Sequence, residues 1–409
     1  MNKRKIKILL VLLLISLIVF SGCTNSITLF KNKENKMGET EQNQIQNGPS
    51  PEEKQRMEIE EQRKKELGDL YVPLPPLKKE ENPRVKVKGI YITGNTAGIP
   101  QKLDHLVQLV ENTELNAMVI DVKDDDGLMT YESKIEMVNK TGANTKVRIK
   151  NIDELISNLK SKNIYPIARI VVFKDPNLSK NRPDLSIQKK TGGVWRDNKG
   201  VSWVNPYNKT VWDYNIAIAK EAALHGFREI QFDYIRFPEN GKKVDREAYF
   251  PGQNGKSKED NIAEFIAYAR EQLKDYNVYV SVDVFGLVTA VKDDMGIGQK
   301  WEKIAPLVDY ISPMVYPSHY GPYNYGFKNP NAHPYEVVYK ALKDAKEKNS
   351  KLQTYAIVRP WIQDFNLGYP PYHANELRAQ IKAVYDNGYE EWMVWNPNNK
   401  YSENAFLKE

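Results

Sequence analysis

The sequence has 409 residues and a formal net charge of +6 at pH 7, with lysine and glutamate interspersed along its body. It contains no basic stripe and no RNA- or DNA-binding motif, which argues against nucleic acid as a partner. The single cysteine excludes an internal disulfide, so stability must come from packing, and the chain is long enough to bury a sizeable core.

Residues 1–23 have the pattern of an export signal. Four basic residues lie within 1–7, and the apolar run 8–20 that follows is too short to span a bilayer comfortably. Ser21-Gly22-Cys23 ends this run and resembles the lipobox of bacterial lipoproteins, in which the cysteine is lipidated. We therefore expect Cys23 to carry a lipid that anchors the protein to the membrane, outside the cytoplasm. An uncleaved membrane anchor is the alternative.

The segment 24–83 is predicted to be a flexible, charged and proline-rich linker. Residues 24–50 are rich in Asn, Gln, Lys and Glu and have few large apolar side chains, as in a disordered tether. Residues 51–67 can form a charged helix without a clear apolar stripe, and 72–76 form a stiff spacer. The folded domain is expected to occupy 84–409.

From residue 84 onward, strand and helix patterns alternate. Strands are predicted at 87–93, 117–123, 166–173, 229–237, 278–285, 310–316, 354–359 and 391–395. Helices between them include 100–114, 153–162, 210–225, the segment that Ser257 and Asp260 begin as a capping box, and 375–387 with Asn375 as its N-cap and Gly388 after its end. Eight strands, each but the last followed by a helix pattern, predict a (β/α)₈ barrel.

An open, doubly wound sheet is the alternative fold. That fold usually has a Gly-rich phosphate-binding turn after an early strand, and none is present here. In a barrel, the long loops 174–207, 238–256 and 317–333 all lie on the catalytic face, at the carboxyl ends of the strands.

Two aspartates are predicted to meet at that face. Asp233 ends the fourth strand in the run Phe232-Asp233-Tyr234-Ile235-Arg236-Phe237-Pro238, and Asp283 lies near the end of the fifth strand. Alternation places both carboxylates on the inner face, and neighbouring strands lie about 4.8 Å apart. Such a pair suits cleavage of a glycosidic bond, with Asp233 as nucleophile and Asp283 as acid/base. A purely structural role in ion pairs or hydrogen bonds inside the barrel is the alternative for each.

Further side chains are expected around this pair. Arg236 and Arg359 are expected to keep one of the two carboxylates ionised by lowering its pKa. Asp121 is a rival acid, and Lys123 is expected to share its face. The full set of predicted substrate-binding residues is Tyr91, Asp121, Lys123, Arg169, Arg236, Tyr316, His319, Arg359, Trp361 and Trp395. The aromatic residues among them suit stacking on sugar rings, although ordinary packing explains any single one equally well.

Other chemistries have weaker support in the sequence. Asp124-Asp125-Asp126-Gly127 could bind calcium through oxygen ligands but lacks regular ligand spacing, so a solvated turn is favoured. The five histidines show no paired zinc-ligand spacing, and no Gly-x-Ser-x-Gly elbow follows a strand. We therefore expect neither a metal nor another cofactor.

Five segments together resemble a bacterial family of glycoside hydrolase-type domains long filed under unknown function. They are 87–93, 119–124, 232–238, 281–286 and 312–317, and the resemblance covers about residues 85–400. It implies a glycosidase-type barrel, often carried on exported or lipid-anchored proteins. Asp233 matches the strand-four carboxylate that serves as nucleophile in related barrels. Those barrels place the acid on strand five or six, and here strand six has no inner carboxylate.

The sequence thus predicts a monomeric, surface-anchored glycoside hydrolase that acts on extracellular or cell-wall polysaccharide. A non-catalytic polysaccharide-binding lipoprotein on a degenerate barrel is the second hypothesis. A metal-assisted hydrolase or deacetylase that uses Asp121, Asp124 and Asp233 is the third.

Overall fold

The computed structural model describes residues 50–408. The predicted export signal, Cys23 and the tether up to residue 49 lie outside the described residues. No helix within 50–408 is both long enough and apolar enough to cross a membrane. The predicted charged helix is present as α2 (Pro51–Leu67), which buries none of its residues.

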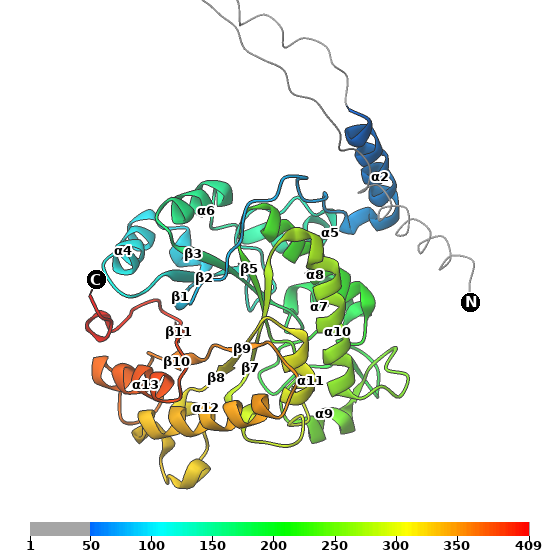
Figure 1. Ribbon diagram of the computed structural model, residues 1–409. Coiled ribbons are helices and arrows are strands. Elements are labelled where there is room, and N and C mark those ends of the chain that lie inside the picture. The colour runs from blue at the N-terminus through cyan, green and yellow to red at the C-terminus, as the bar shows by residue number, and fades with distance from the viewer. Residues whose placement is uncertain (1–49, 409) are drawn as a thin grey trace, which may run out of the picture. The chain divides into compact units, whose positions relative to one another are not determined.

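The core of the fold is a closed barrel of eight parallel strands (Figure 1). In barrel order its strands are β1 (Lys88–Ile92), β2 (Ala117–Lys123), β3 (Tyr165–Val171), β5 (Glu229–Asp233), β7 (Tyr279–Phe285), β8 (Tyr310–Met314), a seventh strand split into β9 (Ile357–Val358) and β10 (Trp361–Gln363), and β11 (Trp392–Trp395). β10 pairs with β11 and also with β8, where Trp361 lies opposite Met314, and this pairing closes the ring. The predicted barrel is confirmed, and the open sheet is excluded.

Helices alternate with the strands and cover the outside of the barrel (Figure 1). The longer ones are α4 (Pro100–Glu111), α6 (Ile152–Ser161), α8 (Lys209–Leu224), α10 (Lys258–Leu273), α12 (Pro334–Ser350) and α13 (Ala374–Asp386). Ser257 caps α10 as predicted, because its Oγ accepts a hydrogen bond from the amide of Asp260. The predicted cap of α13 is wrong. His373 is its N-cap, since the side chain of Glu376 reaches back to the His373 amide.

The inside of the barrel is filled by side chains in successive levels, as in other barrels of this class. Near the amino ends of the strands, Arg359 lies buried between the carboxylates of Glu229 and Glu391. Gln231, Ser281 and Ser312 are buried further along their strands. Tyr91, Asp121, Arg169, Asp233 and Asp283 are buried towards the carboxyl ends.

A segment before β1 runs across the amino ends of the strands. The Asn82 side chain donates hydrogen bonds to the carbonyls of Arg228 and Asn277, which precede β5 and β7. Arg84 donates to the carbonyl of Asp309, directly before β8. The chain therefore enters the barrel at the face opposite to the carboxyl ends.

Two loops on the carboxyl-end face are joined by a small sheet. β4 (Gln188–Lys189), in the loop after β3, pairs antiparallel with β6 (Ala248–Tyr249), in the loop after β5. This pairing fixes two of the long loops relative to each other, above the strand ends that carry Arg169 and Asp233.

Candidate active site

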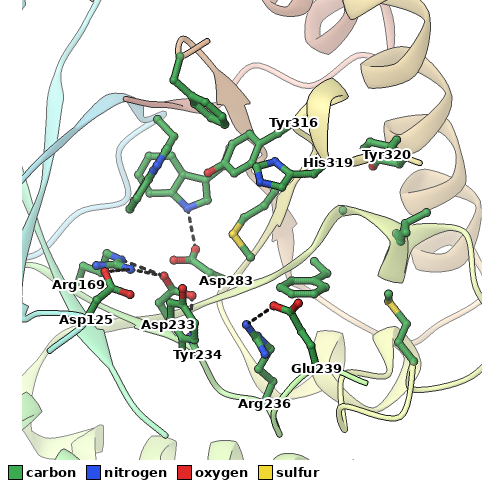
Figure 2. Close-up of a pocket in the computed structure, with 18 of the residues that line it drawn as sticks. Asp125, Arg169, Asp233, Tyr234, Arg236, Glu239, Asp283, Tyr316, His319 and Tyr320 are labelled. Atoms are coloured by element: carbon green, nitrogen blue, oxygen red, sulfur yellow. Dashed lines mark hydrogen bonds and ion pairs between the residues drawn. The ribbon is translucent and has the colours of Figure 1, made fainter. Parts of the chain in front are cut away.

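A cavity of about 580 Å³ opens at the carboxyl ends of the strands (Figure 2). Four acidic side chains and three basic ones line it, together with aromatic and methionine side chains. Its charged lining residues are Asp125, Arg169, Lys199, Asp233, Arg236, Glu239 and Asp283. Both predicted catalytic aspartates therefore face one shared cavity.

Asp233 is held by Arg169 from the neighbouring strand β3. The Nε and Nη2 atoms of Arg169 both donate to Oδ2 of Asp233, at 3.0 and 2.6 Å. Two charge-assisted hydrogen bonds to one carboxylate oxygen hold the Asp233 side chain firmly against the guanidinium. The expected partners of this carboxylate, Arg236 and Arg359, pair with glutamates instead, and Arg169 takes their place.

The residue after Asp233 has an unusual backbone conformation. Tyr234 has φ of +51°, in the left-handed region, where a bulky residue is strained by about 1–3 kcal/mol. In this conformation its amide donates to Oδ1 of Asp233 at 2.6 Å, and its side chain lines the cavity. The strain thus accompanies a contact that fixes the orientation of the Asp233 carboxylate.

Asp283 lies in a different electrostatic environment. Its Oδ1 accepts a hydrogen bond of 2.8 Å from the indole nitrogen of Trp361, and no basic side chain is paired with it among residues 50–408 (Figure 2). Burial raises the pKa of Asp283 well above its usual range, and the nearby charge of Asp233 raises it further. Burial and the charge of Asp233 therefore favour the protonated form of Asp283, whereas Asp233 is paired with Arg169.

The two carboxyl groups occupy adjacent positions on neighbouring strands. β5 and β7 pair in register up to Phe232 opposite Val282, and the next position on each strand is Asp233 and Asp283. Side chains at equivalent positions of adjacent strands point to the same face, about 4.8 Å apart at the backbone. This spacing suits the roughly 5–5.5 Å separation of carboxyl groups in retaining glycosidases.

Tyr91 and Asp121 lie behind Arg169 and do not line the cavity. Nη1 of Arg169 donates to Oδ1 of Asp121 at 2.7 Å, and the Tyr91 hydroxyl donates to Oδ2 at 2.6 Å. Burial raises the pKa of Asp121 to about 6, although Arg169 opposes this effect. Tyr91 also stacks on Trp395, with ring centroids 3.8 Å apart, and the guanidinium of Arg169 lies over both rings. The group holds Arg169 in place against Asp233.

Six of the ten predicted substrate-binding residues line the cavity. They are Arg169, Arg236, Tyr316, His319, Trp361 and Trp395. The aromatic side chains among them come from the ends of strands six, seven and eight, opposite the strands that carry Arg169 and Asp233. The cavity thus has a charged side and an aromatic side.

The expectation that Lys123 shares the inner face with Asp121 is wrong. The pairing of β2 with β3 shifts register between Asp121 and Lys123, and this irregularity turns Lys123 to the other face. There its Nζ forms a fully buried ion pair of 2.7 Å with Asp175, and it lies over the ring of Tyr214 in α8. Lys123 does not line the cavity.

Arg359 is also placed away from the cavity. Its Nη1 pairs with Glu229 at 3.0 Å and its Nε with Glu391 at 3.1 Å, both at the amino-end level of the barrel. The expectation that Arg359 supports a catalytic carboxylate is therefore wrong, because its charge is taken by these two glutamates.

Several cavity residues were not assigned there from the sequence. Asp125, Tyr234, Glu239, Phe285 and Phe365 all line the cavity. Asp125 and Glu239 lie in the loops that directly follow β2 and β5. Their short distance in sequence from a strand end was the signal that could have placed them at the cavity. Burial tends to raise the pKa of Asp125, but the charges of Arg169 and Lys174 outweigh burial and hold this pKa below its usual range.

The acidic run 124–126 is a turn whose carboxylates are engaged by protein groups. Oδ1 of Asp124 accepts hydrogen bonds from the amides of Asp126 and Leu128, both at 3.0 Å. Oδ2 of Asp124 lies 3.3 Å from Arg148. Across residues 50–408, no cluster of three or more His, Cys, Asp or Glu side chains is arranged to hold a metal ion.

Known structures with a similar fold include glycoside hydrolases. The glycoside hydrolase domain of PgaB from Bordetella bronchiseptica matches 78% of this chain and 99% of its own, with 12% identity and a TM-score of 0.59. α-L-Fucosidase isoenzyme 2 from Paenibacillus thiaminolyticus matches 78% of this chain and 48% of its own, with 13% identity and a TM-score of 0.53. At these identities the likeness concerns the fold.

A hypothetical protein from Ruminiclostridium thermocellum is more similar in sequence. It is 44% identical over 51% of this chain and 98% of its own, with a TM-score of 0.44. None of the curated proteins matches the chain. A family model described as "Putative glycosyl hydrolase domain" matches residues 89–401, which is well over half of the chain. The chain therefore belongs to this glycosyl hydrolase domain family.

Proposed function

We propose that the protein is a glycoside hydrolase that cleaves polysaccharide by a two-carboxylate mechanism. The observation that carries the proposal is the contrast between Asp233 and Asp283, which share one cavity. Asp233 is paired with the Arg169 guanidinium, whereas Asp283 has no basic partner among the described residues and its pKa is raised by burial and by Asp233, which favours its protonated form. Two adjacent carboxyl groups in opposite protonation states are the pair that glycosidic cleavage requires.

In the first step, Asp283 donates its proton to the departing glycosidic oxygen while Asp233 attacks the anomeric carbon. The bond to the leaving sugar breaks, and a covalent glycosyl–Asp233 ester forms. In the second step, Asp283, now a carboxylate, removes a proton from water, and the resulting nucleophile displaces Asp233 from the sugar. Asp283 is then protonated again, Asp233 is ionised again, and the configuration at the anomeric carbon is retained.

The surrounding residues support these steps. Trp361 donates its indole N–H to Oδ1 of Asp283, so Oδ2, which has no hydrogen-bond partner among the described residues, is the oxygen that carries the proton. Arg169 leaves Oδ1 of Asp233 to the Tyr234 amide and to the sugar. Tyr316 and Trp395 offer aromatic faces on which a sugar ring can stack.

We further propose that the substrate is an extracellular or cell-wall polysaccharide. The support is the export pattern of residues 1–23, with Cys23 in a lipobox-like position. Similar barrels that are themselves glycoside hydrolases, from Bordetella bronchiseptica and Paenibacillus thiaminolyticus, are consistent with saccharide chemistry on this fold.

The test is the Asp233→Asn variant, assayed for hydrolysis and for binding against an array of polysaccharides. Turnover should fall by about 10⁴-fold or more, because the nucleophile is lost. The melting temperature should stay within a few degrees, since Asp121 and Asp125 still neutralise Arg169. Saccharide binding should persist.

Asp364→Asn is the matched control, because Asp364 is a buried aspartate at a strand end that does not line the cavity. Its activity should match that of the parent. Parental hydrolysis by Asp233→Asn would show that the nucleophile assignment is wrong.

A non-catalytic polysaccharide-binding protein is the second candidate, and the firm hold of Arg169 on Asp233 favours it. In that case the array would show binding without hydrolysis in the parent protein. The third, metal-assisted hypothesis is less favoured, because Arg169 and Tyr91 engage Asp121, and the turn amides and Arg148 engage Asp124.

A further inference from the structure

Two basic side chains on the cavity wall do not belong to the Arg169 group. They are Arg236, just after β5, and Lys199, in the loop after β3. Figure 2 shows Arg236 beside Glu239, apart from Arg169 and Asp125. The proposed two-carboxylate mechanism uses neither cation.

Arg236 is buried among aromatic rings but is only partly neutralised. Its guanidinium lies 4.6 Å from the ring centre of Phe285, 4.9 Å from that of Tyr234 and 5.1 Å from that of Trp203. Nη1 donates to the carbonyl of Phe237, and Nη2 pairs with Glu239 at 3.0 Å. Nε has no hydrogen-bond partner among residues 50–408. Burial lowers the pKa of Arg236, despite opposing contributions from Tyr234 and Glu239.

Glu239 is a weak partner for so deeply buried a cation. Its side chain is 69% exposed, whereas that of Arg236 is 6% exposed. An ion pair with a solvent-exposed carboxylate contributes about 0–1 kcal/mol, because water screens it. A ligand anion that enters the cavity can therefore share or replace this contact at small cost.

Lys199 has no counter-charge at all among the described residues. It lies in a turn whose geometry is set by Asp197, which accepts the amides of Lys199 and Val201 at 2.8 and 3.0 Å. The other oxygen of Asp197 accepts the indole N–H of Trp203, and Trp203 lies against Arg236. One aspartate thus holds the Lys199 turn onto the ring that packs against Arg236.

Three of the four acidic side chains of the cavity already have a basic partner. Asp125 is paired with Arg169 and Lys174, and Asp233 with Arg169. Glu239 is paired with Arg236. Asp283 has no basic partner, but burial and the charge of Asp233 favour its neutral form. The cations without a full counter-charge are Lys199 and Arg236, so the part of the cavity around them favours an anion over an amine.

We propose that the saccharide bound in this cavity carries an anionic substituent, a carboxylate or a sulfate or phosphate ester, that Arg236 and Lys199 bind together. A planar guanidinium binds such oxyanions through paired N–H groups, and a lysine adds a mobile point charge. This inference rests on the proposed function for its setting, the sugar in the cavity, and adds the substrate class.

The test measures binding to the inactive Asp233→Asn variant by quenching of tryptophan fluorescence, since Trp361 and Trp395 line the cavity. The probes are oligosaccharides of alginate, hyaluronan and peptidoglycan glycan strands for carboxylates, a sulfated galactan for sulfate esters, and a phosphomannan for phosphate esters. Each is paired with its carboxyl-reduced, desulfated or dephosphorylated counterpart. At least one acidic probe should bind about tenfold or more tightly than its neutral counterpart, and added salt should reduce the difference.

Two variants locate the effect. Lys199→Gln and Arg236→Gln, each made in the Asp233→Asn background, should lose most of the preference for the acidic probe and keep binding of the neutral one. Lys189→Gln is the control, because Lys189 is exposed on β4 of the same loop and does not line the cavity. It should keep the full preference.

The possible results separate this inference from the proposed function. Equal binding of every acidic and neutral pair, or no binding of any acidic probe, overturns the inference. So does a preference that survives in both Lys199→Gln and Arg236→Gln. Hydrolysis of a neutral saccharide by the parent protein without any acid preference leaves the proposed function intact, whereas acid-selective binding without hydrolysis of any probe removes the proposed function alone.

Discussion

The two ends of the barrel interior contain similar groups in different settings. At the amino end, buried Arg359 lies between Glu229 and Glu391 and 3.6 Å from the ring centre of Tyr310. At the carboxyl end, buried Arg169 lies among three aspartates and over Tyr91 and Trp395.

The two ends differ because the carboxyl end also contains Asp283 and the cavity that this residue lines. Both carboxylates at the amino end pair with Arg359, which is fully buried. The carboxyl end has in addition Asp283, an acid that pairs with no basic side chain among residues 50–408 and faces the cavity. A buried arginine–carboxylate group alone therefore does not indicate function, whereas an additional acid with a raised pKa beside a cavity does.

In the comparison of the two ends, the largest expected effect comes from a substitution of Asp283. Asp283→Asn should lower kcat by about 10²–10⁴-fold on a natural saccharide, because the proton donor is lost. The loss should be much smaller on an aryl glycoside whose leaving group needs no proton. Stability at neutral pH should not fall, since a neutral amide replaces a neutral acid. Rates on both substrate types and thermal unfolding measure this, and equal losses on the two substrates would contradict the acid role.

The corresponding substitution at the amino end should lower stability and leave activity unchanged. Arg359→Met should lower the free energy of unfolding by about 3–5 kcal/mol, because Glu229 and Glu391 are left buried without a cation. The activity per folded molecule should be unchanged. Denaturant unfolding and active-site-normalised kinetics measure the two effects.

Two further variants check that the stability loss comes from the unpaired glutamates. Adding Glu229→Gln and Glu391→Gln to Arg359→Met should recover much of the lost stability. Arg84→Met, an exposed arginine that contacts Tyr310, should cost less than about 1 kcal/mol. An active-site defect in folded Arg359→Met would show that the two ends are not independent.

The smallest effect is a shift of the pH profile. Activity should fall at alkaline pH as Asp283 loses its proton. The hydrogen bond from the Trp361 indole to Asp283 lowers the pKa at which this happens. Trp361→Phe removes that bond, so the pKa rises and the alkaline limb should move to higher pH. The shift should be roughly 0.5–1 pH unit, because a hydrogen bond contributes about 0.5–1.5 kcal/mol and one pKa unit corresponds to about 1.4 kcal/mol.

Trp395→Phe is the control for this shift, since Trp395 lines the cavity without a hydrogen bond to Asp283. Its alkaline limb should stay in place. A shift to lower pH in Trp361→Phe would mean that the proton resides elsewhere in the cavity.

Regular alternation explains which parts of the site could be predicted. Asp233 and Asp283 lie in strands that keep their register, so counting by twos placed both on the inner face, beside one cavity. The eight-strand barrel followed from the repeated strand and helix patterns. The predicted strands at 229–237 and 310–316 nevertheless ran too long, because the chain leaves the sheet at Asp233 and at Met314.

Irregular backbone explains the errors. The register shift after Asp121 turned Lys123 outward, and nothing in the local sequence marks it. The seventh strand is interrupted between Val358 and Trp361. The depth of the Arg359 side chain in the barrel could therefore not be predicted by counting residues along the strand. Its partner Glu229 lies 130 residues away, and contacts at that separation are not visible in a local pattern.

The crossing of 82–84 under the amino ends of the strands has a consequence for orientation. The polypeptide that leads into the barrel approaches it from the closed side, where Arg228, Asn277 and Asp309 receive it. These contacts lie on the side of the barrel away from the cavity, so residues 82–84 leave the mouth at the carboxyl ends uncovered. A ligand that enters the cavity therefore does not meet this segment.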